Sequence, residues 1–216
     1  MENQKIMFTP YKIVFAPGEG EYEEKKSRFI AHVSPAESEQ EAAEFIEGVR
    51  KKYYDARHNC TAYIIGRNRE ITRCSDDGEP SGTAGKPILE VLLGAEVTNV
   101  VVVVTRYFGG TLLGTGGLVR AYTQATKEGL ANAVIVTMRF GVELTICADY
   151  TDVGKVQYLL ANEQIEVAQS RYTEKVEFDI QIPKERQKAV TQKLIEATSA
   201  RVQILEKGEG YYREKR

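Results

Sequence analysis

Apolar residues recur at helical spacing in the first quarter of the chain. They occupy positions i, i+3, i+4, i+7 and i+11, which form one stripe along a helix. Ahead of the stripe, the segment from Ser34 to Glu37 has the form of a capping box with proline at the first helical position. We therefore expect an amphipathic helix that begins at Pro35 and buries Ala42, Phe45, Ile46, Val49 and Tyr53.

The rest of the first half alternates between strand and helix patterns. Two β-branched segments around residues 66–69 predict a hairpin, and the valine-rich segment Val97–Thr105 predicts a strand buried on both faces. Pro87 opens a short helix that Gly94 ends. The other elements that we expect are strands at Arg28–Val33, Thr61–Ile65 and Glu70–Cys74, and a helix that buries Leu118, Ala121, Tyr122, Ala125 and Gly129.

From Gly141 the patterns follow the order strand, helix, strand, strand, helix, strand, which is the order of the ferredoxin-like fold. We therefore predict an α+β protein of two domains, residues 1–136 and 140–206, followed by a loose polar tail at 207–216. The strands of the second domain are expected at 142–148, 165–172, 175–182 and 201–205, and its helices at 152–162 and 184–199.

Charge and composition narrow the possible function classes. The net charge is −2, so the protein as a whole lacks the basic character of a general nucleic-acid binder. The longest apolar run, Val100 to Val104, is far shorter than the ~20 residues that span a bilayer. The chain starts without a secretory signal pattern, and its three cysteines fit no disulfide framework. We therefore expect a cytoplasmic protein.

Two glycine-rich loops, Ser75–Lys86 and Arg106–Gly117, each lead into a predicted helix. A helix N-terminus offers unpaired N–H groups and a partial positive charge, and glycines let a ligand approach that backbone closely. Together with the cations Lys86, Arg106 and Arg120, the loops suit a phosphate, a carboxylate or a nucleic-acid backbone. The candidate ligand or partner surface comprises His58, Ser75, Asp76, Asp77, Glu79, Ser81, Gly82, Thr83, Gly85, Lys86, Arg106, Tyr107, Gly109, Gly110, Thr115, Gly116, Gly117 and Arg120.

A purely structural role for the glycines is the alternative, because tight connections need positive φ. That role does not explain why hydroxyls and charges share the same loops.

The standard nucleotide motifs do not fit. A P-loop needs glycine at the position of Pro80 and serine or threonine at that of Pro87, and Val119 stands where a dinucleotide fingerprint needs a small residue.

Neither a metal nor a cofactor is expected from the ligand spacing. Asp76, Asp77 and Glu79 do not match a calcium loop; such residues are typical turn formers, and here they are also potential partners for the arginines. The cysteines and His58 supply too few ligands for zinc. Cys60 fits a small core position. No complete catalytic set can be named, so enzymatic activity stays open.

Three blocks of sequence together resemble a known family. They are DARHNC at 55–60, SDDGEPSGTAG at 75–85, and a block from 105 to 122 that begins TRYFGG and ends RAY. In this order they resemble the IMPACT family over roughly the first 136 residues, and the second half resembles the small C-terminal domain of its bacterial members. The eukaryotic protein regulates translation with a further N-terminal domain that this chain lacks, so its mechanism is not carried over.

The resemblance implies a fold for each domain. For the first it implies the α+β fold of the second domain of a small-subunit ribosomal protein, which recurs in translation factors. For the second it implies a ferredoxin-like fold similar to the last domain of elongation factor G. The link to translation rests on fold analogy, which does not by itself assign a function.

Two functions are compatible with these observations. One is a binding protein that engages RNA or the ribosome and regulates translation, with Tyr107 and Phe108 available for base stacking. The other is an enzyme acting on a small phosphorylated or carboxylated substrate, with the loop carboxylates or His58 as acid, base or metal ligand. One convergent pocket around Lys86, Arg106 and Arg120 would favour the enzyme, whereas a broad face would favour the binding protein.

Overall fold

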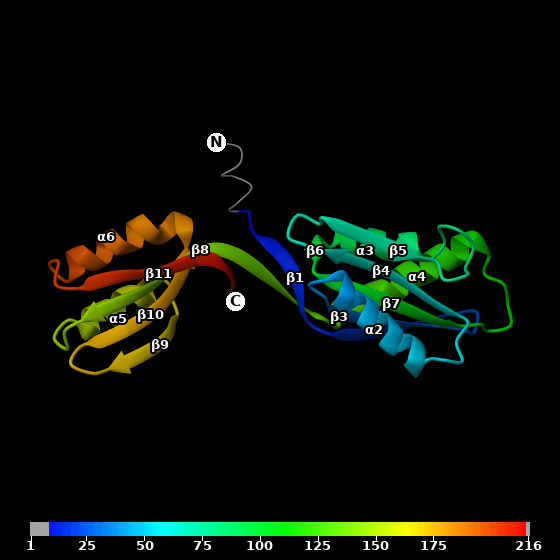
Figure 1. Cartoon of the computed structure of the whole chain (residues 1–216), viewed down its shortest axis with the longest axis horizontal. Coiled ribbons are helices and arrows are strands. Elements are labelled where there is room, and N and C mark those ends of the chain that lie inside the picture. Colours follow the sequence, from blue (N-terminus) through cyan, green and yellow to red (C-terminus); the bar gives the residue numbers. More distant parts are fainter. Residues whose placement is uncertain (1–8, 215–216) are drawn as a thin grey trace. The chain divides into compact units, whose positions relative to one another are not determined.

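The computed structural model describes residues 9–214, which divide into two compact units. The first is Tyr11–Thr137, and the second contains residues 138–214 together with Thr9 and Pro10. Each unit has its own helices (Figure 1) and its own apolar core. The predicted α+β class with two domains is confirmed.

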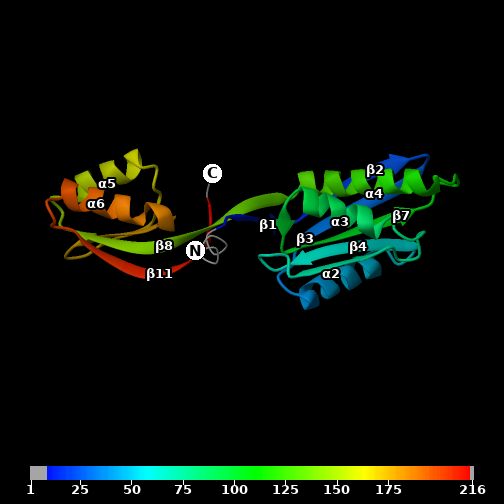
Figure 2. The same cartoon turned by 90° about the horizontal axis from the view of Figure 1, so that it is seen from above.

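The first unit is built on a five-stranded sheet with the order β2-β3-β7-β4-β5. Helices α3 and α4 cover one face and α2 covers the other (Figure 2), and β1 pairs in parallel with β6. The elements are β1 (Tyr11–Ala16), β2 (Gly18–Glu24), β3 (Ser27–Pro35), α2 (Glu39–Lys52), β4 (His58–Ile65), β5 (Ile71–Ser75), α3 (Gly85–Gly94), β6 (Val97–Thr98), β7 (Val100–Tyr107) and α4 (Gly114–Ala131).

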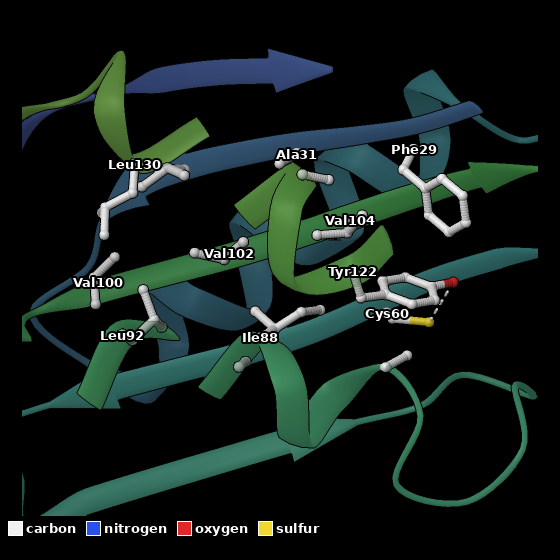
Figure 3. Close-up of a cluster of buried hydrophobic side chains, with 14 of the residues drawn as sticks. Phe29, Ala31, Cys60, Ile88, Leu92, Val100, Val102, Val104, Tyr122 and Leu130 are labelled. Carbon is white, nitrogen blue, oxygen red and sulfur yellow. Dashed lines mark hydrogen bonds between the residues drawn. The ribbon is translucent and has the colours of Figure 1, made fainter. Parts of the chain in front are cut away.

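The core of this unit lies on both faces of β7. Val100, Val102 and Val104 point towards α3 and α4, where they meet Ile88 and Leu92 (Figure 3). Val101 points the other way and packs under α2. All of these side chains are fully buried, and each stabilises the fold by roughly 1.5–3 kcal/mol relative to exposure. The prediction of a strand buried on both faces is confirmed.

The predicted strand Val97–Thr105 is divided by Asn99. This residue has a φ of 51°, which interrupts the extended backbone between β6 and β7. Its side-chain Oδ1 accepts a hydrogen bond from the Gly66 N–H at 2.9 Å. Asparagine tolerates this left-handed conformation better than a β-branched residue does, so the break falls at the one residue of the run that is not β-branched.

Helix α2 begins later than predicted. Pro35 ends β3, and the N-cap is Ser38, whose Oγ accepts the Glu41 N–H at 3.2 Å. The Glu41 carboxylate in turn accepts the N–H of Glu37 at 2.8 Å. The capping interaction is therefore displaced by one helical turn, because Ser38 and Glu41 repeat the spacing seen at Ser34 and Glu37. Of the predicted apolar stripe, Ala42 and Val49 are buried and Phe45 and Ile46 are half-buried, whereas Tyr53 is the half-buried C-cap residue after the helix.

Strands β1 and β2 were not predicted. The sequence of β2 alternates glycine with acidic residues, so it lacks the apolar period that marks a strand. Gly18 and Gly20 are buried because α4 packs directly on the β2 backbone. A Cβ atom on Gly20 would overlap the backbone around Gly129.

The second unit has the predicted βαββαβ order. Its antiparallel strands lie in the order β11-β8-β10-β9, and the two helices share a core with one face of the sheet. The elements are β8 (Val134–Ala148), α5 (Val153–Asn162), β9 (Val167–Tyr172), β10 (Val176–Pro183), the 3₁₀ turn η1 (Lys184–Arg186), α6 (Gln187–Ala197) and β11 (Gln203–Arg213).

Two features of this unit differ from expectation. The segment from residue 207 is not a loose tail, because β11 continues to Arg213 and pairs with β8. Its glycines suggested a loop, but Gly208 only marks a shift in the pairing register. The division between the units falls inside β8 rather than in a linker. None of the helices within residues 9–214 is long and apolar enough to cross a membrane.

Candidate functional site

Four connections of the first unit meet where β7 ends, and we call this region the loop end. They are the β2–β3 turn at 25–26, the α2–β4 connection at 53–57, the β5–α3 loop at 76–84 and the β7–α4 loop at 108–113. The antiparallel register places them together, because Arg106 on β7 pairs with Phe29 on β3 and with His58 on β4. The three family-like blocks of sequence therefore converge at one end of the sheet.

The first glycine-rich loop is filled by its own carboxylate. Asp76 Oδ1 accepts hydrogen bonds from the N–H groups of Ala84 and Gly85 at 3.0 and 2.8 Å, and Oδ2 accepts one from Gly82 at 2.8 Å. Burial would raise the pKa of this carboxyl, but the three N–H donors outweigh it and hold the pKa below its usual value. The start of α3 is therefore not the open anion site that the sequence suggested.

Asp77 ties the same loop to α2 and β4. Its carboxylate accepts hydrogen bonds from the Asn59 N–H at 2.7 Å and from the Arg50 guanidinium at 3.1 Å. Its backbone carbonyl accepts the Nδ1–H of His58 at 2.9 Å. Within residues 9–214, no group of three or more His, Cys, Asp or Glu side chains could hold a metal ion. Asp77 and His58 thus fix the loop to the sheet.

Arg106 is not the exposed cation that the sequence suggested. It is buried and forms an ion pair with the buried Glu79, with 2.6 Å between Arg106 Nη1 and Glu79 Oε1. The Tyr122 hydroxyl donates to the same oxygen at 2.8 Å. Of the three loop carboxylates that the sequence offered as partners, Glu79 is the one that pairs with this arginine among residues 9–214.

Cys60 completes this buried cluster. Its Sγ lies 3.3 Å from the Tyr122 hydroxyl (Figure 3) and 2.9 Å from the Asp76 carbonyl. One thiol proton can serve only one of these acceptors at a time. Burial raises the pKa of the Cys60 thiol and of the Tyr122 hydroxyl well above their usual values. Neither group is therefore ionised near neutral pH, and Cys60 is not an activated nucleophile.

Phe108 covers the outer side of Arg106. The guanidinium carbon lies 5.4 Å from the ring centroid of Phe29 and 5.7 Å from that of Phe108. Phe29 is fully buried, whereas Phe108 is 56% exposed. The next residue, Gly109, rests on the β2–β3 turn, where a Cβ atom would overlap the backbone of Lys26. The start of the β7–α4 loop is therefore held closely against β3.

The second glycine-rich loop remains open. Helix α4 begins at Gly114, four residues earlier than the predicted start at Leu118, and has neither a side-chain cap nor an acidic residue in its first turn. Gly110 and Gly114 have positive φ values of 85° and 69°, which favour glycine. Arg120 is exposed on the same helix. Unpaired N–H groups and a partial positive charge are thus presented to solvent here.

Several exposed cations of the loop end have no acidic partner. No ion pair among residues 9–214 involves Lys25, Lys26, Arg57 or Arg120. Lys86 is exposed too, but it lies 3.9 Å from Glu90. Lys25, Lys26 and Arg57 were not among the predicted site residues, because they lie outside the glycine-rich loops. Two lysines with positive φ form a tight hairpin turn, but the turn is visible only once β2 is known.

The other predicted residues have structural or surface positions. The Tyr107 hydroxyl donates to Asp55 at 2.7 Å, which raises the pKa of Tyr107 to about 12. The Thr83 hydroxyl donates to the Pro80 carbonyl at 2.7 Å, and the Ser75 hydroxyl accepts the Asp77 N–H at 3.3 Å. Ser75, Ser81, Thr115 and Gly116 are exposed, while Gly117 is buried against Leu113.

Comparison with known proteins identifies both halves of the chain. Residues 25–130 match the Impact N-terminal domain, and residues 146–201 match a Domain of unknown function (DUF1949). The chain is 43% identical over 209 residues to the IMPACT family member YvyE of Bacillus subtilis (strain 168), with 97% of this chain and 96% of that protein covered.

Two further relatives agree. The IMPACT family member YigZ of Escherichia coli (strain K12) is 35% identical over 183 residues, covering 84% of this chain and 90% of that protein. A crystal structure of a hypothetical protein is 34% identical with a TM-score of 0.59, covering 91% of this chain and 96% of that chain. As the three blocks at the loop end predicted, the chain belongs to the IMPACT family.

Proposed function

We propose that this protein is a binding protein that engages RNA, free or within the ribosome, through the loop end, and thereby regulates translation. The observation that carries the proposal is the set of exposed cations without acidic partners around the uncapped start of α4. Phe108 and Tyr54, which are 56% and 87% exposed, lie among them. Cations interleaved with exposed aromatic rings suit a strand of phosphates and bases.

The inward-facing acidic residues are compatible with this proposal. The carboxylates of Asp76 and Asp77 accept hydrogen bonds from backbone N–H groups, and that of Asp77 also accepts one from Arg50. Glu79 is neutralised by Arg106. A polyanion at the loop end therefore meets the unpaired cations rather than these three carboxylates. This arrangement explains how a chain of net charge −2 can present a local surface for phosphate.

The enzyme alternative has less support from the same geometry. Its candidate acids, bases and nucleophile, Asp76, Asp77, His58 and Cys60, are all occupied in holding the loops together. A groove of about 540 Å³ does exist between α3 and α4, but none of the predicted site residues lines it. The candidate residues that remain accessible are spread over a face, as expected for a macromolecular partner.

The second unit offers a less suitable surface for RNA. The face of its sheet opposite the helices carries Glu143, Glu177 and Asp179, since the alternating residues of the same strands form the core. Arg171 on this face is paired with Glu177 and Asp179. An open sheet that binds RNA usually presents aromatic and basic side chains. We therefore assign RNA binding to the first unit.

Ribosome binding by a charge-deficient variant tests the proposal. Lys25→Gln, Lys26→Gln and Arg120→Gln together remove three unpaired positive charges, and glutamine suits the positive-φ turn about as well as lysine does. The matched control is Lys127→Gln, Lys188→Gln and Lys207→Gln, three exposed lysines away from the loop end. Both variants would be sedimented with ribosomes over a range of salt concentrations.

We expect the loop-end variant to lose binding while the control retains it. About four phosphate contacts would give a slope of about −3 in log affinity against log salt for single-stranded RNA. Equal binding by the two variants, or binding that does not respond to salt, would rule out an RNA interaction through the loop end.

A further inference from the structure

We infer that the loop end binds unpaired nucleotides by stacking a base on Phe108, so that its RNA ligand is single-stranded rather than duplex. This inference rests on the proposed function and specifies the ligand of the same surface.

Phe108 is supported from beneath in a way that suits a stacking platform. Arg106 lies between the rings of Phe29 and Phe108, at 5.4 and 5.7 Å from their centroids. Arg106 is itself fixed by Glu79 at 2.6 Å, and its Nε is buried without a hydrogen-bond partner among residues 9–214. Buried donors without a hydrogen-bond partner are rare in folded proteins. We therefore infer that Arg106 supports the exposed ring of Phe108 in addition to packing in the core.

The chain on either side of Phe108 restricts where the ring can go. The Gly109 N–H donates to Ser27 Oγ at 3.1 Å, and no side chain larger than glycine fits against the β2–β3 turn at this position. Phe108 therefore follows the last residues of β7 and precedes a fixed contact with β3. Its ring is held in place before a ligand arrives, which lowers the entropy that stacking costs.

Groups that can bind phosphate belong to the two segments that adjoin Phe108. The β2–β3 turn, with Lys25 and Lys26, contacts Gly109 directly. The open start of α4 follows within a few residues, with Arg120 farther along the helix. A nucleotide whose base lies on Phe108 can thus place its own phosphate or the next one near the lysines or the helix N-terminus.

Duplex RNA does not suit this arrangement. The faces of its bases are already stacked on one another, and a base must be unstacked and unpaired before its face is free. Its deep, narrow major groove does not admit side chains to the bases. An isolated exposed ring is useful only where a base is already unpaired, as in a loop, a bulge or a single strand.

The test compares RNA forms and Phe108 variants by fluorescence anisotropy. The probes are a labelled single-stranded RNA of twelve nucleotides, the duplex of the same sequence, and a chain of equal length without bases. Phe108→Leu keeps an apolar side chain without a ring, and Phe108→Trp restores a ring. Tyr158→Leu is the control, since Tyr158 is 71% exposed but belongs to α5 of the second unit and not to the loop end.

We expect the wild-type protein to bind the single strand more tightly than the duplex. Phe108→Leu should weaken that binding by about 5- to 100-fold, the range for loss of one base–aromatic stack. Phe108→Trp should retain the binding, and Tyr158→Leu should leave it unchanged. The chain without bases should bind wild type and Phe108→Leu equally, because neither combination can stack. Urea denaturation of each variant checks that the fold is intact.

Two results would overturn the inference and leave the proposed function standing. One is equal affinity for duplex and single strand. The other is an unchanged affinity of Phe108→Leu while the charge-deficient loop-end variant loses ribosome binding, which would assign the face to phosphate contacts or to a ribosomal protein. If wild type binds neither ribosomes nor RNA, the proposed function itself fails and the inference with it.

Discussion

At the scale of single residues, the loop end separates charges that hold the fold from charges that face solvent. Arg106 and Asp76 lie in the blocks that suggest anion binding, yet each is committed to a partner within the chain. Arg120 and the β2–β3 turn lysines have no such partner in the described part of the chain, residues 9–214. Removing a charge of the first kind should therefore reduce stability, and removing one of the second kind should reduce binding.

Arg106→Met should lower the free energy of unfolding by about 3–5 kcal/mol, because it leaves the buried Glu79 carboxylate without its cation. Adding Glu79→Gln should recover part of the loss, since the uncompensated charge is then removed. Arg120→Gln, an exposed site, should stay within about 0.5 kcal/mol of wild type. Urea denaturation measures all three, and a small effect of Arg106→Met would mean that Glu79 is solvated.

Asp76→Ala should cost about 2 kcal/mol, because three N–H groups at the start of α3 lose their acceptor. The folded state lowers the pKa of Asp76, so its contribution is present above the unfolded value of about 3.9 and is lost as the pH falls through the lower folded value. The difference between wild type and Asp76→Ala should therefore narrow in acid.

Urea titrations from pH 7 down to pH 3 would follow this difference, with Ser81→Ala as the control. Ser81 is an exposed residue of the same loop, so its loss should change stability by less than about 0.5 kcal/mol. A gap for Asp76→Ala that widens as the pH falls would contradict the assigned role.

At the scale of elements, the sequence predicts most strands and helices because their apolar spacing is strong. The valine run of β7 and the stripe of α2 are such cases. The differences arise where two local signals compete or where none exists. Two equivalent capping patterns precede α2, and only tertiary structure selects Ser38, because residues up to Pro35 are needed to pair with β7. Strand β2 has no apolar alternation, since α4 packs on its glycines.

The structure brings most of the predicted site residues to the loop end, but it gives several of them roles that the sequence did not indicate. Pattern analysis finds glycines and charges in a loop, but not whether a carboxylate turns inward to cap the helix beside it. That choice depends on the register between β4 and β7, which brings His58 opposite Arg106. Lys25 and Lys26 could not be assigned to the site, because their turn lies far from its loops in the sequence.

The start of α2 can be tested with two serines. Ser38→Ala should reduce the free energy of unfolding by about 1 kcal/mol, because the Glu41 N–H loses its acceptor. Ser34→Ala should be nearly neutral, since the Ser34 hydroxyl contacts only the neighbouring Pro35 carbonyl. Thermal or urea denaturation compares the pair, and the reverse order would place the helix start at Pro35.

Two glycines provide a further test of packing between elements. Gly20→Ala should destabilise the protein by at least about 1–3 kcal/mol, because the added methyl would force α4 away from β2. Gly48→Ala in α2 should instead stabilise it by up to about 1 kcal/mol, because that position opens to free space and alanine favours a helix. If both substitutions had the same sign, the contact of α4 with β2 would need revision.

At the scale of the whole molecule, the two cores are separate in sequence. The apolar clusters of the first unit use residues from Val14 to Ile135, and that of the second uses residues from Val142 to Ile204. The division falls within β8, between Thr137 and Met138. A composition-based boundary near this point was accessible from the sequence, whereas the continuity of the strand across it was not.

Separate cores and a binding surface confined to the first unit predict the behaviour of the isolated halves. A chain of residues 11–137 retains both apolar clusters of its unit and all four connections of the loop end. We expect it to unfold cooperatively and to bind single-stranded RNA within about twofold of the full chain, since the contacts that supply the affinity are unchanged. Circular dichroism on heating and fluorescence anisotropy measure the two properties.

A chain of residues 138–216 should fail to bind, because the open face of its sheet is acidic. If residues 11–137 unfold cooperatively but do not bind RNA, while the full chain does bind it, then part of the binding site belongs to the second unit.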